Sequence, residues 1–565
     1  MRLEWIDWSI VIAFLVFSLV LGLLLTRRAG KGVEEFFLSG RSLPWWLTGT
    51  SMVATSFSAD TPLAVSELVR THGVAGNWLW WCYGFGGMLS VFIFARFWRR
   101  AEVLTDAELT EVRYAGTGAR LLRGFRGFYF STVRNCLVMG WIILAMATLL
   151  TAILPGMNRV HTVAISCAIA LVYSVLSGFW GVVITDLFQF VLAMTGAVAA
   201  AVFALRKVGG LDGLVAALGP ERFEAMASPF PSSGAEWLPF SAFLIYCTML
   251  WWCTDNADGG GIIVQRMSAS RDEREAVRAT LWFQFSHYAL RTWPWVIVAL
   301  ASLVLLPDMT DHKAAYPATA FAVLPPIWRG IFLASLLAAF MSTLVTHLNW
   351  GASYLVNDIY RRFLDRSASE KRLVLVSRLA TVLLMIGGAF VALRYRTITG
   401  AWILTISLGA GAGIVYVLRW FWWRVNAWSE LSAMLASLAV NAGLRLFAPE
   451  LAFPYTLPWI VGLSASVWVP VTFLTRPVEE ERLQRFVEKV RPVGAWGGRR
   501  GAASGKGPLA RWLGQWAIGV VALYLFLFGG GRIVLGKPWT GALLLAGGFA
   551  AAALLFRMMS REKWS

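Results

Sequence analysis

The 565-residue sequence has few charged residues and few residues that bind metals. Only 15% of it is Asp, Glu, Lys or Arg, and it contains five cysteines and five histidines. The cysteines are Cys82, Cys136, Cys167, Cys247 and Cys253. They form no CxxC pair and lie in or beside apolar stretches, so we interpret them as small packing residues, not as disulfides or metal ligands. The scattered histidines and the lack of a nucleophile beside a base give no indication of an enzyme active site.

Apolar sequence, in contrast, is abundant. Hydrophobic residues make up 58% of the chain, which includes 30 tryptophans and 36 phenylalanines. A single soluble core cannot use so many long apolar runs, so the sequence predicts an all-α polytopic membrane protein with about fifteen spans. The predicted spans are residues 8–26, 44–68, 77–98, 127–154, 160–178, 179–205, 238–262, 281–306, 329–356, 372–393, 399–423, 428–446, 455–475, 512–532 and 538–556.

The basic excess has a topological explanation. The formal net charge is +18, from 50 Lys and Arg against 32 Asp and Glu. If the N-terminus lies outside, most of the basic residues fall on one side of the membrane, in loops such as 264–280, and the positive-inside rule makes that side the cytoplasm. We therefore expect a protein of the plasma (cytoplasmic) membrane with a cytoplasmic C-terminus and no nucleic-acid partner. The charged segment 101–126 is expected to lie on the cytoplasmic surface as an amphipathic helix.

The stretch from Trp45 to Arg70 is apolar enough to enter a membrane but poorly suited to a continuous helix. Its middle, residues 54–62, places small hydroxyl residues before Asp60 and Pro62, and proline removes a backbone donor. We expect a break near the middle of the membrane, where freed carbonyl groups must line a cavity or meet an ion. The alternative is a kinked helix whose Ser and Thr hydroxyls bond back to their own carbonyls.

A second stretch, residues 338–346, favours an ion site. Ala339, Ser342 and Thr343 occupy positions i, i+3 and i+4, so one helix face presents small residues and two hydroxyls. Neutral oxygens suit a monovalent cation that must be released again. Such a face can also form a close helix crossing. Together with a break at residues 56–61, it predicts a cation site made only of oxygen ligands.

Charged side chains within apolar spans are candidates for function because charge is costly there. Arg134 either has a functional role or extends toward the nearby cytoplasmic end of its span. Asp186 is expected to face protein or water, and a partner Arg or a helix N-terminus would explain it without transport. Arg291 follows His287 by four residues on one helix face, and we interpret His287 as structural.

Two further acids, Asp255 and Asp258, precede three consecutive glycines in the segment 251–278. Glycine is unfavourable inside a helix, so a continuous helix is not expected here. The carboxylates either meet a cation or polar substrate beside freed backbone, or cap the charged helix that follows. The sequence leaves both interpretations open.

Taken together, these segments resemble the sodium/solute symporter family, which includes sodium-coupled sugar, proline and sialic-acid carriers. The resemblance runs from about Phe36 to Trp423 and rests on GRSLPWW, ATSFSAD, YSVLSGFWGVVITDLFQF, IIVQRM and AAFMSTLVTHLNWGASYLVNDIY. It implies a LeuT-type fold of two inverted five-helix repeats, with sodium as the coupling ion and no other cofactor. The implied function is sodium-coupled symport of a small polar solute (a sugar, amino acid or organic acid) by alternating access. The alternative is a transporter-fold solute sensor, although the tail 557–565 is too short for a signalling domain.

The resemblance also implies binding residues. The first sodium site would use backbone oxygens of Ala54, Phe57 and Ala339 with the hydroxyls of Ser342 and Thr343. A second sodium site or exit path is implied at Asp186 and Thr346, although Val345 offers no hydroxyl beside it. The substrate candidates come from the interrupted segments and from charge complementarity of intramembrane arginines with a carboxylate. They are Asp60, Thr61, Arg134, Asp255, Asp258 and Arg291.

The predicted organisation has seven parts along the chain. They are a leader helix and cytoplasmic hinge (1–43), the first repeat (44–206), an external loop (207–237), the second repeat (238–424), accessory helices (425–476), a basic cytoplasmic linker (477–511), and two terminal helices with a tail (512–565). The first span lacks a cleavage site of small residues, so we expect it to be a retained helix. No chemistry is expected from the helices after residue 428.

Overall fold

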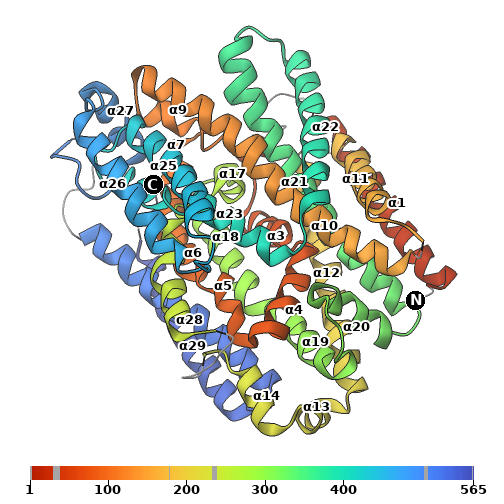
Figure 1. The fold of residues 1–565 in the computed structure, drawn as a ribbon. Coiled ribbons are helices and arrows are strands. Elements are labelled where there is room, and N and C mark those ends of the chain that lie inside the picture. Colours follow the sequence, from red (N-terminus) through yellow and green to blue (C-terminus); the bar gives the residue numbers. More distant parts are fainter. Residues whose placement is uncertain are drawn as a thin grey trace.

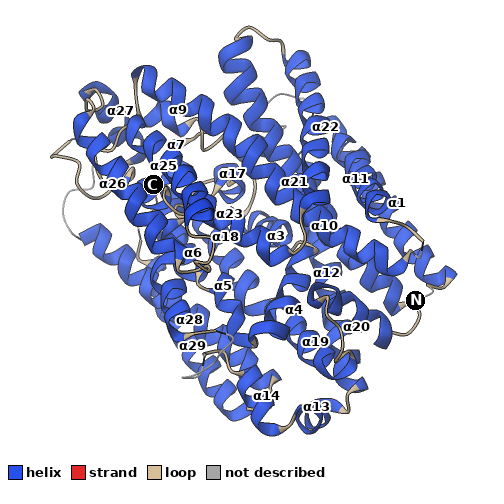
Figure 2. Ribbon diagram, in the orientation of Figure 1, coloured by secondary structure: helices blue, strands red, loops and turns tan. Residues whose placement is uncertain are grey.

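The computed structural model describes residues 3–29, 38–154, 156–176, 179–231, 238–499, 501, 507–562 and 564. Parts of the predicted hinge, external loop and basic linker, and residues 177–178 of the YSVLSGFWG motif, lie outside this set. Where it is described, the chain is almost entirely helical, as Figure 2 shows. Within these described residues, the only β-structure is a pair of isolated bridges, Leu43 with Ser270 and Trp422 with Ala495. The prediction of an all-α chain is confirmed.

The first half of the chain holds the leader helix and the elements of the predicted first repeat. These helices are α1 (Trp5–Ala29), α3 (Trp45–Ser56), α4 (Asp60–His72), α5 (Trp78–Trp81), α6 (Tyr83–Leu89), α7 (Ala95–Ala101), α8 (Leu109–Arg113), α9 (Gly116–Phe128), α10 (Asn135–Ile153), α11 (Arg159–Leu176), α12 (Phe179–Lys207), α13 (Gly210–Leu218) and α14 (Pro220–Ala227). A π-helical turn at Tyr129–Arg134 joins α9 to α10 in one rod of 38 residues.

The second half holds the elements of the predicted second repeat and the accessory helices. The former are α15 (Phe240–Ile245), α16 (Trp251–Cys253), α17 (Gly261–Ala269), α18 (Glu273–Phe285), α19 (Thr292–Leu305), α20 (Ala315–Val323), α21 (Trp328–Tyr354), α22 (Glu370–Arg394), α23 (Ile398–Gly409) and α24 (Gly413–Leu418). The accessory helices are α25 (Ala427–Phe447), α26 (Thr456–Leu474), α27 (Glu480–Val490), α28 (Gly507–Val534) and α29 (Pro538–Ser560).

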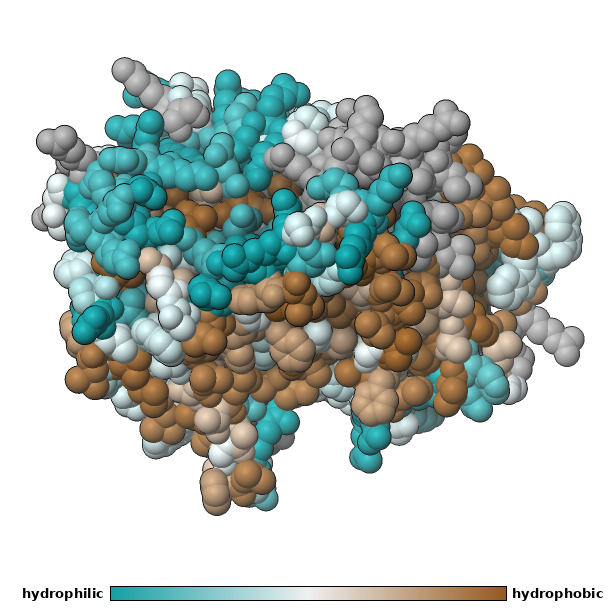
Figure 3. Space-filling view, turned by 90° about the horizontal axis from the view of Figure 1, so that it is seen from above, coloured by the Kyte–Doolittle hydropathy of each residue, from teal (hydrophilic) through white to brown (hydrophobic). Residues whose placement is uncertain are grey.

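The helices have the length and composition of an integral membrane protein. Within the described residues, 10 continuous helical segments are long and apolar enough to cross a membrane. Shorter apolar helices add to them at Trp5–Leu21, Arg159–Leu171, Phe240–Cys253 and Ile398–Gly409. Each half of an interrupted helix is too short to count as a membrane span by itself, so the total of about fifteen spans remains a prediction. Figure 3 shows one face of the molecule, on which hydrophilic residues gather along one edge and hydrophobic residues cover most of the remainder.

α3 and α4 are the two halves of an interrupted helix. α3 ends at Ser56, Phe57 leaves the helical conformation with φ −92° and ψ 75°, and α4 begins at Asp60. Pro62 lies in the first turn of α4, where a missing N–H removes no helical hydrogen bond. The predicted break is therefore confirmed, and the alternative of a kinked but continuous helix is wrong.

A second interruption separates α16 from α17. Gly259 and Gly260 have φ angles of 123° and 74°, a region that residues with a side chain rarely adopt. The third glycine, Gly261, begins α17. The prediction that this segment is not a continuous helix is also confirmed.

α3 occupies the centre of the molecule in Figure 1 and packs against α12, α17, α18 and α21. Gly49 permits the close approach to α18, because a Cβ atom there would lie 2.6 Å from the carbonyl oxygen of Ala279. The accessory helices α28 and α29 pack against each other away from this centre, and α28 contacts α6. The interrupted helix is thus enclosed by helices of both predicted repeats.

The charged segment 101–126 differs from its prediction as a surface helix. It forms a loop, α8 and most of α9, and its buried side includes guanidinium groups. Arg113 is fully buried and Arg126 is 1% exposed. The prediction of a single surface helix is wrong because distant segments compensate these arginines in the interior: Arg113 donates to the backbone carbonyl oxygens of Arg419, Trp422 and Val425, and Arg126 pairs with Glu430 of α25. The local charge pattern does not reveal these partners.

Candidate functional site

The hydroxyl face of α21 lies against the broken end of α3. Thr343 Oγ1 donates a 2.7 Å hydrogen bond to the carbonyl oxygen of Thr55, and it also lies 3.1 Å from the carbonyl oxygen of Ala339. The carbonyl oxygen of Ala54, in the same last turn of α3, accepts a 3.1 Å hydrogen bond from the N–H of Phe57. The fold therefore joins two segments that are 288 residues apart in sequence.

The five residues predicted for the first sodium site are all buried. Their exposed fractions are 2% for Ala54, Phe57, Ala339 and Ser342, and 4% for Thr343. Carbonyl groups at the end of an interrupted helix lack the next turn that would satisfy them. Together with hydroxyl groups, they provide the neutral oxygens that a monovalent cation can bind and leave. One of the five, Ser342, already has a partner outside this set: its Oγ donates a 2.5 Å hydrogen bond to Asp186 Oδ1.

Asp186 links α12 to both α3 and α21. Its other oxygen, Oδ2, accepts a 2.5 Å hydrogen bond from Ser51 Oγ and lies 3.7 Å from Nη2 of Arg266. The same Nη2 atom donates to the hydroxyls of Thr55 and Thr346 at 2.7 and 3.0 Å. The two residues predicted for a second sodium site, Asp186 and Thr346, are therefore joined by a guanidinium group.

Arg266 is the residue of this site that the sequence pattern failed to single out. The predicted spans place it in the cytoplasmic loop 264–280, but it lies in α17 and is fully buried. Loop assignment from hydropathy treats an Arg beside polar residues as solvated, and it does not register a carboxylate supplied by another helix. The sequence feature that could have indicated a role for Arg266 is its position in IIVQRM, directly after the second interruption.

Arg134 and Asp255 form an ion pair across the second interruption. Arg134 Nε lies 2.7 Å from Asp255 Oδ2, and Nη2 lies 3.3 Å from Oδ1. Arg134 is therefore paired with a carboxylate from a distant segment. Both residues line a cavity of about 230 Å³ together with Asp106, His347 and Trp350.

A second cavity, of about 260 Å³, opens at the first interruption. We call it the central cavity. Its lining includes Asp60 and Thr61 from the start of α4, Arg291 beside α19, and Thr343 from the hydroxyl face of α21. Asp60 Oδ2 accepts a 3.2 Å hydrogen bond from the indole of Trp402 on α23. Three of the substrate candidates thus share one cavity, which adjoins the predicted sodium ligands.

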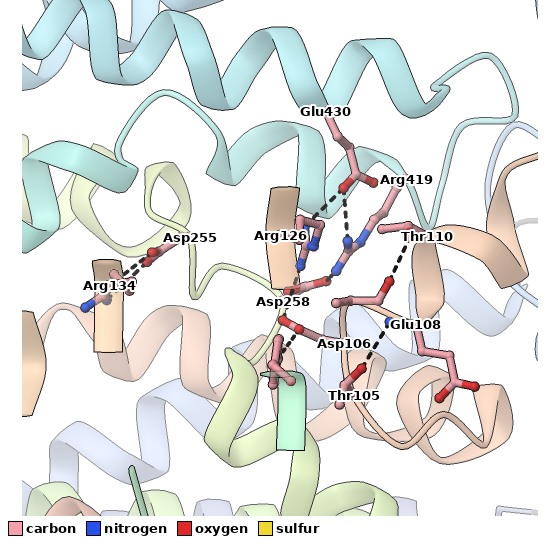
Figure 4. A network of polar contacts seen from close by, with 12 residues as sticks. Thr105, Asp106, Glu108, Thr110, Arg126, Arg134, Asp255, Asp258, Arg419 and Glu430 are labelled. Carbon is pink, nitrogen blue, oxygen red and sulfur yellow. Dashed lines mark hydrogen bonds and ion pairs between the residues drawn. The ribbon is translucent and has the colours of Figure 1, made fainter. Parts of the chain in front are cut away.

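Asp258 belongs to a different group, the buried ion-pair network in Figure 4. It lies 2.6 Å from Arg419, which lies 3.3 Å from Glu430. Glu430 lies 3.1 Å from Arg126, which in turn lies 3.2 Å from Asp106. Glu430 comes from α25, so an accessory helix for which no chemistry was expected contributes a buried charge. Asp258 is not among the residues that line either cavity described above.

The position of Asp258 predicts a role in stability. Asp258→Asn removes the closest negative charge from a buried guanidinium, so we expect a loss of about 3 kcal/mol in the free energy of unfolding. The apparent affinity for the transported solute should stay unchanged. Thermal denaturation in detergent and an uptake assay measure the two quantities. The matched control is Asp311→Asn, which removes an ion pair with Lys313 at an acid that is 51% exposed and should change little. A variant that weakens solute affinity without lowering stability would contradict this role.

Comparison with known proteins adds an independent line of evidence. A sodium/mannose cotransporter of Bos taurus is 25% identical over 509 residues, which cover 81% of this chain and 83% of that protein. A sodium/glucose cotransporter of Vibrio parahaemolyticus is 25% identical over 518 residues, covering 85% and 92%. The solved structure of a substrate-bound, outward-open Na⁺-coupled sialic acid symporter superposes with a TM-score of 0.69 at 19% identity, covering 84% of this chain and 99% of that one.

The structural similarity establishes a shared fold. The sequence similarity extends through both predicted repeats and into the accessory helices. The family model described as the sodium:solute symporter family matches residues 36–437, well over half of the chain. Members of this family are transporters and not enzymes. On this evidence, the chain belongs to the sodium:solute symporter family.

Proposed function

We propose that this protein is a secondary active transporter that carries a small polar solute together with sodium by alternating access. The observation that carries the proposal is the contact between the broken end of α3 and the hydroxyl face of α21. Backbone carbonyls and hydroxyls meet there in the interior, beside a cavity of about 260 Å³. The relatives named as sodium/glucose and sodium/mannose cotransporters support sodium as the coupling ion.

In this proposal, sodium binds the carbonyl oxygens of Ala54, Phe57 and Ala339 and the hydroxyls of Ser342 and Thr343. Thr343 would bind the ion through a lone pair of its hydroxyl oxygen, which leaves its single O–H able to donate to a carbonyl oxygen. Because Thr343 also lines the central cavity together with Thr55 and Ser56 of α3, an ion at this position would stabilise the end of α3 in the geometry that the solute meets. Binding of sodium and binding of solute would then reinforce each other.

The proposed architecture has two inverted repeats, 44–206 and 238–424, in a cytoplasmic membrane with the N-terminus outside. Each repeat contains one interrupted helix near its start: α3 and α4 in the first, and α16 and α17 in the second. The placement of irregular backbone around internal cavities supports this division, since such backbone is not tolerated against lipid.

Uptake by proteoliposomes tests the proposal. An inward sodium gradient should drive accumulation of a labelled solute, and replacing external sodium with choline should abolish it. The alternative of a solute sensor predicts sodium-dependent binding of the solute without accumulation. Uptake that is indifferent to sodium would contradict the proposed coupling.

Arg266 leads to a prediction of stoichiometry. Its guanidinium lies among the oxygens of Ser51, Thr55, Thr346 and Asp186, so a cationic group already occupies the predicted second sodium site. We expect one sodium ion per solute. At a membrane potential of 100 mV and a tenfold gradient, one ion supplies about 3.7 kcal/mol, enough for several-hundred-fold accumulation of a neutral solute. Paired measurements of sodium and solute flux check this, and a ratio of two would contradict it.

A further inference from the structure

Arg291 carries a buried positive charge into the central cavity. The residue is 1% exposed, and among the described residues its guanidinium hydrogen-bonds only with His287: Nε donates to the carbonyl oxygen at 3.0 Å, and Nη2 lies 2.5 Å from Nδ1 and 3.1 Å from Nε2 of the imidazole. Its Nη1 has no hydrogen-bond partner among the residues that the structure describes. The rings of Phe57 and Trp295 flank the guanidinium at 5.6 and 5.3 Å.

Within the described part of the chain, no carboxylate lies within ion-pairing distance of Arg291. An arginine cannot lose its charge in a protein, so burial without an anion is unfavourable. Aromatic faces and a neutral imidazole compensate only part of this cost. Arg134, which lines the neighbouring cavity of about 230 Å³, already pairs with Asp255 at 2.7 Å. Of these two arginines, Arg291 is therefore the one whose buried charge a bound anion would stabilise.

Asp60 places a buried negative charge in the lining of the same cavity. It is 3% exposed, and its Oδ2 accepts one hydrogen bond, from Trp402. Its Oδ1 and the hydroxyl of the neighbouring Ser58 have no hydrogen-bond partner among the described residues. A buried carboxylate with an unused oxygen favours a positively charged donor. The central cavity thus holds a guanidinium and a carboxylate that make no direct ion pair with each other among the described contacts.

We propose that the transported solute is a small zwitterion of the amino-acid type, whose carboxylate pairs with Arg291 and whose amino group pairs with Asp60. This inference rests on the proposed function and adds the substrate class to it. A guanidinium binds a carboxylate through two parallel hydrogen bonds. The two protein charges lie in one cavity, so a dipolar solute satisfies both. A neutral sugar would leave both buried charges unpaired, which is the strongest way for a binding site to reject a ligand.

The first experiment measures sodium-driven uptake in proteoliposomes of the full-length protein. The probes are the twenty proteinogenic amino acids, lactate, glucose and mannose. We expect uptake of at least one zwitterionic amino acid, with one charge moved per solute if one sodium accompanies it. The amide of that amino acid and its analogue without the amino group should compete about a hundred-fold more weakly. Sodium-driven uptake of a hexose but of no amino acid would overturn the zwitterion and leave symport intact. Absence of sodium-driven uptake for every probe would overturn symport and the zwitterion together.

Variants then test each half of the site. Arg291→Gln should raise the half-saturating amino-acid concentration ten- to hundred-fold, and Arg291→Lys, which keeps the charge, should raise it less. Asp60→Asn should reduce the preference for the amino acid over its analogue without the amino group at least tenfold. A role in packing alone would not change that preference. The matched control is Arg445→Gln, the same replacement at an exposed position on α25, where uptake should be unchanged.

Sodium-induced thermal stabilisation, measured without solute, separates solute recognition from folding. We expect Arg291→Gln and Arg291→Lys to retain it, because neither removes a proposed sodium ligand. If both variants transport the amino acid with wild-type affinity, or if Asp60→Asn leaves the preference for the amino group unchanged, the zwitterion proposal is overturned.

Discussion

The double variant Ser342→Ala, Thr343→Ala is expected to bind sodium at least a hundred-fold more weakly than the wild type. Each replacement removes a hydroxyl from a site with five proposed ligands, and a contact of a hydroxyl with a charged group contributes about 1.5–3 kcal/mol. The alanine side chains still fit the helix crossing, so the fold should persist. The sodium dependence of uptake measures the change.

The effect on solute should be indirect. Because coupling between two ligands is reciprocal, solute affinity should fall at limiting sodium and recover at high sodium. Thr343→Ser is the matched control, since it keeps the oxygen and removes only a methyl group. An unchanged half-saturating sodium concentration in the double variant would refute the site, because it would mean that these hydroxyls only fill the crossing.

Arg266→Gln is expected to produce the largest loss of stability. Asp186 is fully buried, and the guanidinium of Arg266 is the cation beside it. Removing one partner of a buried ion pair costs about 3–5 kcal/mol, since the remaining charge stays uncompensated. The same guanidinium donates to the hydroxyls of Ser51, Thr55 and Thr346, which join α3 to α21. Thermal denaturation in detergent measures the loss.

A matched double variant isolates the charge. Arg266→Gln combined with Asp186→Asn removes both charges and should recover most of the stability lost by Arg266→Gln alone. With Asp186 intact, sodium has a free carboxylate to bind, so sodium chloride should stabilise the Arg266→Gln variant more than the wild type. Choline chloride should not. If the single variant denatures at the wild-type temperature, Arg266 does not compensate Asp186.

The two interruptions were predictable from sequence because their causes are local. Small hydroxyl residues followed by Asp60 and Pro62 predict a helix that stops and restarts, and three glycines predict a second break. The type of contact that Thr343 makes with the end of α3, a hydroxyl against a backbone carbonyl, was also predictable. Broken backbone leaves carbonyl oxygens unsatisfied, and a face of hydroxyls is one of the few partners that an apolar chain can offer them.

Which charges pair with which was decided only by the tertiary structure. Asp186 with Arg266, Arg134 with Asp255, and Asp258 with Arg419 each join residues 80 or more positions apart. Because of its pairing with Asp186, Arg266 lies in the core, whereas the sequence predicted it in a loop. The pairings also distinguish Arg134, which pairs with a carboxylate, from Arg291, which has no ion-pair partner in the part of the chain that the structure describes. Hydropathy and helical periodicity describe the neighbours of a residue along the chain, whereas compensation of a buried charge depends on groups that approach it through space.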